Sequence, residues 1–130
     1  MMDTTAWAAF GVSHAAAGDV FYIRFNRVAA RLLKDVDKVY IKRTQTGSHI
    51  ILEPVPYYDL DKNKMALSIA WYSGKYPVIS CTKIVDTFLS RRYFDGRRCK
   101  VKRGKAGAYI CMNEIIERED ENRKDEKRNT

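Results

Sequence analysis

The chain has 130 residues, and its 24 Lys and Arg against 16 Asp and Glu give a net charge of +8. This is the usual length of one domain, and a hydrophobic content of 45% is enough to form a core without staples. Three cysteines at long spacings, with no Cys-x-x-Cys pair, exclude a disulfide framework and a zinc site. We expect Cys81, Cys99 and Cys111 to be small, partly buried thiols in a reducing compartment.

Positive charge is concentrated in the middle of the chain. Residues 1–19 carry a net charge of −2, and residues 113–130 also carry −2. Residues 20–112 hold nineteen basic and seven acidic side chains, a net charge of +12. Such an excess favours polyanionic partners. The alternative is a basic, solvated surface with no specific partner.

The N-terminal segment lacks the features of a secretory signal. No Lys or Arg precedes Arg24, and the apolar stretch Ala6–Phe10 is short. No window reaches the roughly 18 apolar residues of a membrane-spanning helix. The sequence therefore predicts a cytoplasmic protein without a membrane partner.

The first part of the chain predicts an arm, a strand and a short helix. Residues 1–19 are Ala-rich and weakly patterned, so we expect a short helix around Thr5–Phe10 or a loose N-terminal arm. Val20–Phe25 is rich in β-branched and aromatic residues, which is typical of a strand. Asn26 provides an N-cap for an amphipathic helix over Arg27–Lys34, where apolar residues recur at helical spacing.

A hairpin follows this helix. Val39–Arg43 alternates apolar and polar residues, as a half-buried strand does. Thr44–Gly47 predicts a turn, because Gly47 can adopt a positive φ. Ser48–Glu53 is the returning strand, and Pro54 ends it.

A connector then leads into a second set of similar elements. Residues 57–64 are polar, Met65–Tyr72 predicts an extra strand, and Ser73–Lys75 predicts a turn. The expected elements that follow are the strand Val78–Cys81, the N-cap Thr82 with a helix bearing Ile84, Val85, Phe88 and Leu89, the strand Cys99–Arg103, the turn Gly104–Gly107 and the strand Ala108–Met112. From Asn113 we expect a helix in which Ile115 and Ile116 pack, followed by a frayed, charged tail over residues 117–130.

The two sets of elements match each other along the chain. A displacement of 56 residues, and of 60 after the helix, aligns the following pairs: Ile23 with Ile79, Leu32 with Phe88, Leu33 with Leu89, Gly47 with Gly107, and Ile50 with Ile110. We therefore predict a single domain over residues 20–116 that contains two pseudo-repeats, 20–54 and 77–112, joined by the connector and its strand. The predicted fold is α+β, with two strand–helix–hairpin units forming a compact mixed sheet or barrel. Leu32 and Phe88 would then occupy equivalent core positions. The alternative is two ordinary units with similar periodicity.

The stretch FYIRFNRVAARLLKDVDKVYIKRTQTGSHIILEP resembles the swapped-hairpin repeat of AbrB-like transition-state regulators. In that family a strand runs into a short helix, and a strand, a glycine turn and a final strand follow. Two such copies in one chain resemble the tandem members, which supply both halves of a DNA-binding barrel. The family usually has Ile-Pro where this chain has Ile23-Arg24 and Ile79-Ser80. The resemblance implies DNA binding by basic residues that flank the strand–helix junction.

The densest basic stretch lies in the second unit. On a strand, Arg98, Lys100 and Lys102 share one face and form a ladder that can contact phosphates. The alternative is a solvated edge that prevents aggregation. Tyr93 and Phe94 could stack on bases, but we favour a core position for both. The candidate nucleic-acid-binding residues are Arg24, Arg27, Lys42, Arg43, Arg97, Arg98, Lys100, Lys102, Arg103 and Lys105.

Signals for catalysis or metal binding are weak. Asp59–Asn63 resembles the opening of a calcium loop but lacks the glycine and glutamate that complete it. His14 and His49 have no convergent partners in the sequence, and no nucleotide-binding or nucleophile motif is present. We therefore expect no enzyme activity, no cofactor and no metal.

The sequence favours a small nucleic-acid-binding protein, a DNA-binding regulator whose partner is duplex DNA, acting as a monomer or homodimer. The first alternative is a protein-binding module, such as a phage-type inhibitor that occupies a nucleic-acid-binding effector of the host. A weaker alternative is a small enzyme or toxin that acts on RNA.

Overall fold

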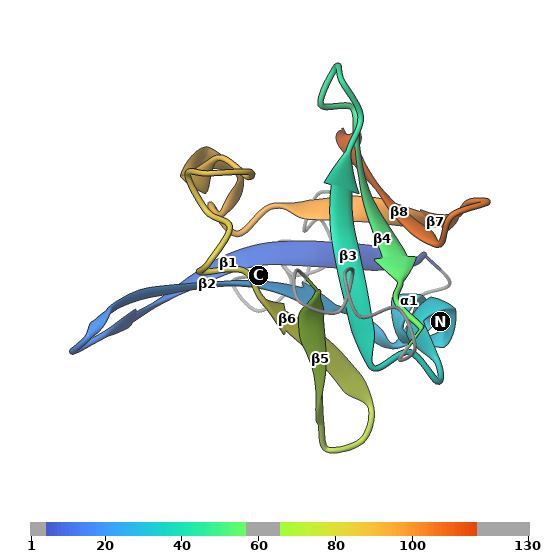
Figure 1. Cartoon of the computed structure of the whole chain (residues 1–130), viewed down its shortest axis with the longest axis horizontal. Helices are drawn as coiled ribbons and strands as arrows, with labels where there is room; N and C mark the ends of the chain where they lie inside the picture. The colour runs from blue at the N-terminus through green and yellow to red at the C-terminus, as the bar shows by residue number, and fades with distance from the viewer. Residues whose placement is uncertain (1–4, 57–65, 117–130) are drawn as a thin grey trace, which may run out of the picture.

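The computed structural model describes residues 5–56 and 66–116, which form a closed antiparallel barrel with the strand order β1-β2-β6-β5-β3-β4-β8-β7 (Figure 1). Its strands are β1 (Trp7–Ala15), β2 (Gly18–Phe25), β3 (Lys38–Arg43), β4 (His49–Pro54), β5 (Leu67–Tyr72), β6 (Tyr76–Ser80), β7 (Arg98–Arg103) and β8 (Ala108–Ile115). The only α-helix in the described part of the chain is α1 (Arg27–Ala30). The prediction of a barrel is confirmed, while the α+β class and the mixed sheet are wrong. The protein is mostly β, and each pair of neighbouring strands is antiparallel.

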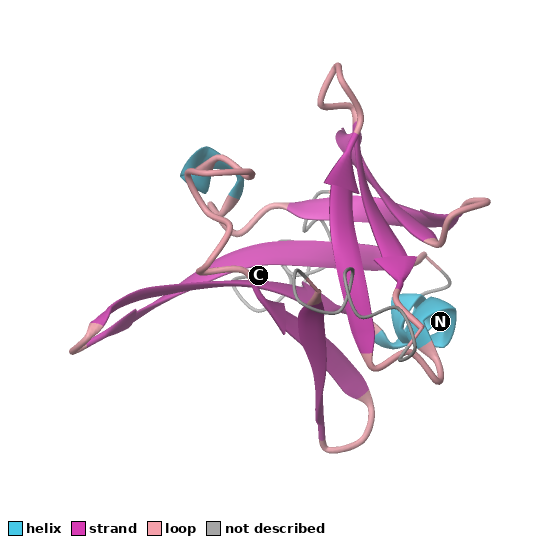
Figure 2. Ribbon diagram, in the orientation of Figure 1, coloured by secondary structure: helices cyan, strands magenta, loops and turns pink. Residues whose placement is uncertain are grey.

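The core fills the interior of the barrel. Alternate residues of each strand point inward, so that one face of the strand is apolar and the other faces solvent. The largest fully buried side chains include Phe10, Phe25, Ile23, Ile50, Leu52, Ile79 and Ile110, which come from five strands. Figure 2 shows that helical segments are short and lie at the margins of this sheet.

The Ala-rich N-terminal segment is a strand, so the prediction of a short helix around Thr5–Phe10 or a loose arm is wrong. β1 pairs with β2 over eight residues and with β7 on its other side. Ala8 and Phe10 are fully buried. Pairing on both edges and burial of one face outweigh the helical propensity of alanine. Beyond Val12 the β1–β2 hairpin projects from the barrel (Figure 1).

The predicted N-cap and first helix are confirmed. The Asn26 side-chain oxygen accepts hydrogen bonds from the backbone N–H of Ala29 at 2.9 Å and of Trp7 at 3.1 Å. Its amide nitrogen donates to the Thr5 carbonyl oxygen at 2.8 Å. One asparagine therefore begins α1 and also fixes the start of β1. A 3-10 turn over Arg31–Leu33 completes the helical segment.

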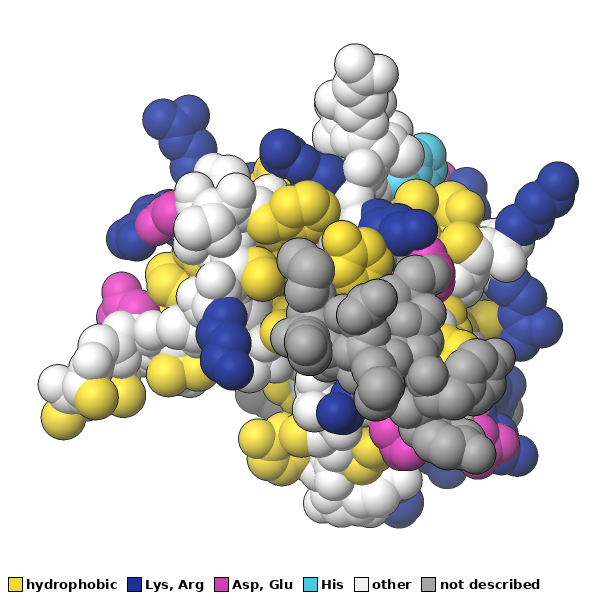
Figure 3. Space-filling model, in the orientation of Figure 1, with side chains coloured by type: hydrophobic (Ala, Val, Ile, Leu, Met, Phe, Trp, Pro, Cys, Tyr) yellow, Lys and Arg dark blue, Asp and Glu magenta, His cyan; other side chains and the backbone are white. Residues whose placement is uncertain are grey.

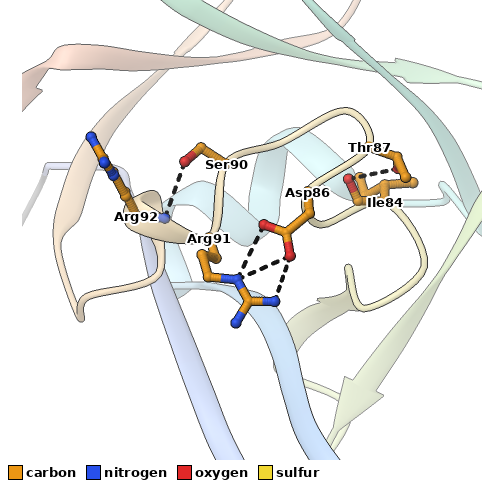
Figure 4. Close-up of polar contacts among 6 residues, drawn as sticks. All are labelled: Ile84, Asp86, Thr87, Ser90, Arg91 and Arg92. Atoms are coloured by element: carbon orange, nitrogen blue, oxygen red, sulfur yellow. Dashed lines mark hydrogen bonds and ion pairs between the residues drawn. The ribbon is translucent and has the colours of Figure 1, made fainter.

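The second predicted helix is absent, which corrects the expectation for Thr82 and the residues after it. The Thr82 hydroxyl accepts a hydrogen bond from the Phe21 backbone instead of capping a helix. A turn begins at Cys81, but Asp86 adopts a φ of +70° and reverses the chain. The β-branched residues of this segment also disfavour a helix. Figure 4 shows the Asp86 carboxylate held by the Arg91 guanidinium, which stabilises this turn.

β8 continues as a strand to Ile115, so the helix predicted from Asn113 is wrong. Lys100 of β7 pairs with Cys111 of β8, but its neighbour Cys99 pairs with Ile115, so the residues between Cys111 and Ile115 form a bulge on β8. The side chain of Ile115 is 54% exposed, and so it does not pack as expected. The predicted charged tail, the polar connector over residues 57–64 and the calcium-loop-like segment Asp59–Asn63 within it lie outside the described residues.

The other predicted strands and turns are confirmed to within two residues in the described part of the chain. Gly47 adopts a φ of +74° in the turn between β3 and β4, as predicted. The three cysteines are free, as expected, and they are buried rather than partly buried. Burial raises the pKa of the Cys81 thiol to about 12. Across residues 5–56 and 66–116, every helix is too short to span a membrane.

Two pairs of residues that match in the internal alignment of the two units are direct cross-strand partners on neighbouring strands. Ile23 of β2 is the direct partner of Ile79 in β6, and Ile50 of β4 is the direct partner of Ile110 in β8. If β1 is exchanged with β5, β2 with β6, β3 with β7 and β4 with β8, the same strands remain neighbours in the barrel. The strand β5, which the sequence indicated as an addition, therefore has a counterpart in β1.

Candidate nucleic-acid interface

Two of the predicted basic residues flank a tryptophan on the outer surface of the barrel. The guanidinium carbon of Arg98 lies 4.3 Å from the centre of the Trp7 ring, and that of Arg24 lies 5.8 Å from it. Both distances are within the range of cation–π contact. The strand pairing explains the arrangement, because Ala9 of β1 is the direct partner of Arg24 in β2 and of Arg98 in β7. A small residue between the two arginines leaves room for both side chains to approach Trp7.

Next to this contact is a cavity of about 420 Å³, which we call the arginine–tyrosine cavity. Its volume lies within the range of about 300–1,000 Å³ that is usual for small-molecule sites. Asn26, Val78, three arginines and four aromatic residues line it: Arg24, Arg27, Arg98, Trp7, Phe25, Tyr72 and Tyr76. The three arginines are among the predicted binding residues, whereas none of the four aromatic residues is.

The tyrosines of the cavity come from the β5–β6 hairpin, which projects from the barrel (Figure 1). Tyr72 and Tyr76 are direct cross-strand partners, and their side chains are 60% and 45% exposed. Ser73 and Gly74 take positive φ values between them and form the tight turn. Hydrophobic side chains gather over this hairpin at the lower end of the view in Figure 3. The hairpin therefore presents aromatic rings to solvent beside the arginines.

The basic ladder predicted on β7 is present. Arg98, Lys100 and Lys102 lie on the outer face of the strand, while Cys99 and Val101 point into the barrel and are buried. Lys100 is the direct partner of Trp7, which joins the ladder to the arginine–tyrosine cavity. The shared outer face confirms the predicted geometry of the ladder.

The far end of the ladder is partly neutralised. The Lys102 ammonium lies 3.0 Å from the Glu114 carboxylate on β8. Hydrogen bonding between the two raises the pKa of Lys102 and lowers the pKa of Glu114. Lys102 therefore contributes less net positive charge to an approaching polyanion than it would without Glu114.

Three further predicted residues are engaged away from the cavity. The Lys42 ammonium lies 2.5 Å from the Glu53 carboxylate, and the Arg43 guanidinium lies over the Phe88 ring at 5.3 Å. Arg97 and Asp95 form a two-pronged ion pair, with both contacts at 3.0 Å. The structure therefore does not bring these three cations to the arginine–tyrosine cavity.

Arg103 and Lys105 belong to a separate region at the β7–β8 turn. They line another cavity, of about 580 Å³, together with Gly104, Leu32 and Glu53. Basic side chains project over this turn at the right edge of Figure 3. Of the ten predicted residues, five lie at the arginine–tyrosine cavity or on the ladder of β7: Arg24, Arg27, Arg98, Lys100 and Lys102. The other five lie elsewhere on the surface.

Phe94 and Tyr93 pack inward rather than offering a stacking surface. Phe94 is buried and makes edge contacts with the rings of Phe10 and Phe21, at centroid distances of 5.4 and 5.3 Å. Tyr93 is partly buried and packs against Phe10 at 6.4 Å. The preference for a core position is confirmed at both residues.

The histidines have local partners. His14 lies 2.6 Å from Asp19 on the exposed β1–β2 hairpin, and the His49 ring lies 2.9 Å from the Ser48 hydroxyl. Within the described residues, no group of three or more His, Cys, Asp or Glu side chains converges in a way that could hold a metal ion.

The exposed aromatic residues left a weak signal in the sequence. Trp71 and Tyr72 immediately precede the Ser-Gly-Lys turn, and Tyr76 immediately follows it. Apolar residues that flank a turn of a short hairpin lie beyond the edge of a barrel core, so they are candidates for exposure. Comparison with protein-family models, with curated proteins and with solved structures gave no match for this chain.

Proposed function

We propose that this protein binds nucleic acid through the arginine–tyrosine cavity and the adjoining outer face of β7. The observation that carries the proposal is the placement of Arg24 and Arg98 against Trp7, with Lys100 as the next cation along the ladder. Stacking on an aromatic ring holds a planar guanidinium in place while its edge remains suited to bidentate phosphate binding. The net charge of +12 over residues 20–112 attracts a polyanion to this surface.

We infer in addition that the barrel consists of two pseudo-repeats related by an approximate twofold axis. The direct pairing of Ile23 with Ile79 and of Ile50 with Ile110 supports this inference, because a twofold axis places equivalent residues opposite each other. The resemblance to AbrB-like regulators implies that basic residues at the strand–helix junction bind DNA. Arg24 and Arg27 lie at that junction and line the cavity, which supports a role as a DNA-binding regulator.

The test is binding of a labelled 20-base-pair random duplex and of the matching single strand, followed by fluorescence anisotropy from about 50 to 200 mM salt. The variant with Arg24→Gln and Arg98→Gln should bind both more weakly, and its salt slope should fall by about 2 if each arginine neutralises one phosphate. The matched control is Arg31→Gln with Lys34→Gln, which removes the same charge from exposed positions outside the cavity. Absence of salt-dependent binding, or equal losses in the two variants, would contradict the proposal.

A protein-binding module is the second candidate function. Trp71, Tyr72 and Tyr76 are exposed on one hairpin, and Trp and Tyr are the residues that most often dominate protein interfaces. A phage-type inhibitor of a nucleic-acid-binding effector would use such a surface to occupy its target. Capture of partners from a cell extract with and without nuclease separates the two functions. A protein partner that survives nuclease, with no binding to purified nucleic acid, would favour this candidate.

A further inference from the structure

We propose that the arginine–tyrosine cavity receives an unpaired nucleotide, so that the protein binds single-stranded nucleic acid in preference to duplex. The base would stack on the tyrosines of the β5–β6 hairpin, and the adjoining phosphates would lie against the arginines. This inference rests on the proposed function and specifies its substrate class. It departs from the preference for duplex DNA that the sequence indicated.

The exposed tyrosines are the first reason. Tyr72 and Tyr76 face each other across the hairpin and are 60% and 45% exposed, so two aromatic rings are presented together to solvent. A duplex offers base edges in its grooves, whereas its base faces are stacked inside. Single strands present unstacked bases whose faces bind aromatic rings. The hairpin therefore has the chemistry for unpaired bases.

The arrangement of charge around the cavity is the second reason. Arg24 lies on β2, and its direct partner on β6 is Val78, which lines the cavity between the arginine and the hairpin tyrosines. Arg98 and Arg27 line the same cavity from β7 and from the start of α1. The arginines, with Trp7 between two of them, thus line the cavity from β2, α1 and β7, and the two exposed tyrosines line it from the β5–β6 hairpin. A nucleotide has parts that match both, since its phosphate is anionic and its base is a flat π-system.

Concavity is the third reason. The cavity has a volume of about 420 Å³ and is lined by residues of the barrel wall and of the β5–β6 hairpin. The convex surface of a duplex contacts such a recess only at its rim, whereas a single strand can turn a base into it. Trp7 acts as a positioning residue here, because it holds the two guanidinium groups at the cavity.

The hairpin supplies its own matched control. Trp71 pairs with Pro77, while Tyr72 pairs with Tyr76, so Trp71 points to the opposite face of the hairpin. Its side chain is 37% exposed, and it does not line the cavity. Trp71→Ala therefore removes an exposed aromatic ring from the same hairpin without changing the proposed site.

The experiment measures the affinity of the full chain for labelled oligo-dT, oligo-U and a duplex of equal length at one salt concentration. The unmodified protein should bind one or both single strands at least about tenfold more tightly than the duplex. The variant with Tyr72→Ala and Tyr76→Ala should lose about 5- to 150-fold in single-strand affinity, the factor expected for one stacked base. Its duplex affinity should change by less than about threefold, and Trp71→Ala should leave all affinities within the same limit. The oligo-dT and oligo-U arms distinguish DNA from RNA as the source of the strand.

A second readout follows the cavity directly. The chain contains two tryptophans, so Trp71→Phe leaves Trp7 as the single tryptophan, whose emission can be excited apart from that of the tyrosines. Binding of a single strand should change the Trp7 emission, and the two tyrosine substitutions should abolish that change at matched occupancy. Tighter binding to duplex, or equal losses with Tyr72→Ala and Tyr76→Ala for both forms, would overturn the inference while leaving the proposed function intact. The proposed function itself fails if neither form binds in a salt-dependent way.

Discussion

The Arg98 guanidinium lies 4.3 Å from the centre of the Trp7 ring, although the two residues are 91 positions apart in the chain. Their contact joins the first strand of the barrel to the seventh, since β1 and β7 pair between Trp7 and Lys100. Closure of the barrel therefore builds the candidate site. A chain in which β1 did not pair with β7 would keep its basic residues but would lose this arrangement of them.

Trp7→Ala should weaken nucleic-acid binding without unfolding the barrel. The ring stacks with Arg24 and Arg98, and each such contact is worth about 0.5–2 kcal/mol. Loss of the ring should lower affinity by about 2- to 13-fold for each arginine, because ordering a side chain on binding costs about 0.5–1.5 kcal/mol once its orientation is no longer fixed. Trp7→Phe should restore part of the loss, since an aromatic face remains. Anisotropy titrations and circular dichroism measure the two effects, and equal affinity for the Ala and Phe variants would contradict a positioning role.

The β4–β8 contact depends on a glycine. Gly107 has a φ of +141°, and a Cβ at this position would lie 2.2 Å from the Leu52 carbonyl oxygen. Gly107→Ala should therefore cost about 1–3 kcal/mol of unfolding free energy beyond the cost of the positive φ alone. Gly18→Ala is the matched control, because Gly18 also has a positive φ but has no atom within 4 Å of the added Cβ. Urea denaturation compares the two, and similar losses would show that the barrel relaxes around the added methyl group.

Most of the strands could be predicted from the sequence, and two local errors show why others could not. Alternating patterns identify strands such as β3 and β7, because one face is buried and the other is solvated. β1 has apolar residues on both faces. Ala8 and Phe10 are buried inside the barrel, and Ala9 is buried on the opposite face. It therefore showed no alternation. The prediction of a second helix is wrong because Asp86 adopts a positive φ, which Arg91 stabilises, and the chain reverses there.

The candidate site could be predicted only in part. Charge density identified Arg98 and Lys100, because a run of basic residues is visible in one stretch of sequence. It could not show that Lys102 and Arg97 have carboxylate partners, which become visible only in the fold. The remainder of the site lies in other parts of the chain. Trp7 and the hairpin tyrosines meet Arg98 only after the barrel has closed.

Truncation of Leu33 or Leu89 should destabilise the barrel more than truncation at the neighbouring positions Leu32 and Phe88. Both side chains are only 1% exposed, whereas Leu32 and Phe88 are partly buried and pack against the edge of the core. The prediction that Leu32 and Phe88 occupy core positions is therefore wrong by one residue in each half, since Leu33 and Leu89 are the buried residues. Leu33→Ala and Leu89→Ala should each cost about 2–5 kcal/mol, and Leu32→Ala should cost about 1 kcal/mol. Urea denaturation of the three variants measures this order, and a Leu32→Ala loss as large as the others would contradict it.

The ion pair of Asp95 with Arg97 should make part of the stability depend on pH. Hydrogen bonds from the Arg97 side chain and backbone hold the pKa of the Asp95 carboxyl below its usual value of 3.8. A carboxyl whose pKa is lower in the folded state stabilises the fold above the unfolded pKa, and this contribution is lost as pH falls through the folded pKa. Asp95→Asn keeps an oxygen for the backbone N–H of Arg97 but removes the charge. The melting temperature of the variant should therefore be lower than that of the unmodified protein at pH 7.

The gap between the two melting temperatures should be constant from pH 7 to about pH 5 and should close below about pH 4, where the carboxyl of the unmodified protein takes up its proton. Asp86→Asn provides a parallel case, because Arg91 lowers the pKa of the Asp86 carboxyl in the same way. Asn also tolerates the positive φ at that position, so the substitution changes the charge without straining the turn. Thermal melts at pH 7, 5, 4 and 3 measure both gaps. A gap that stays the same at every pH would show that the carboxylate charge does not stabilise the fold, and that each substitution acts through its local hydrogen bonds alone.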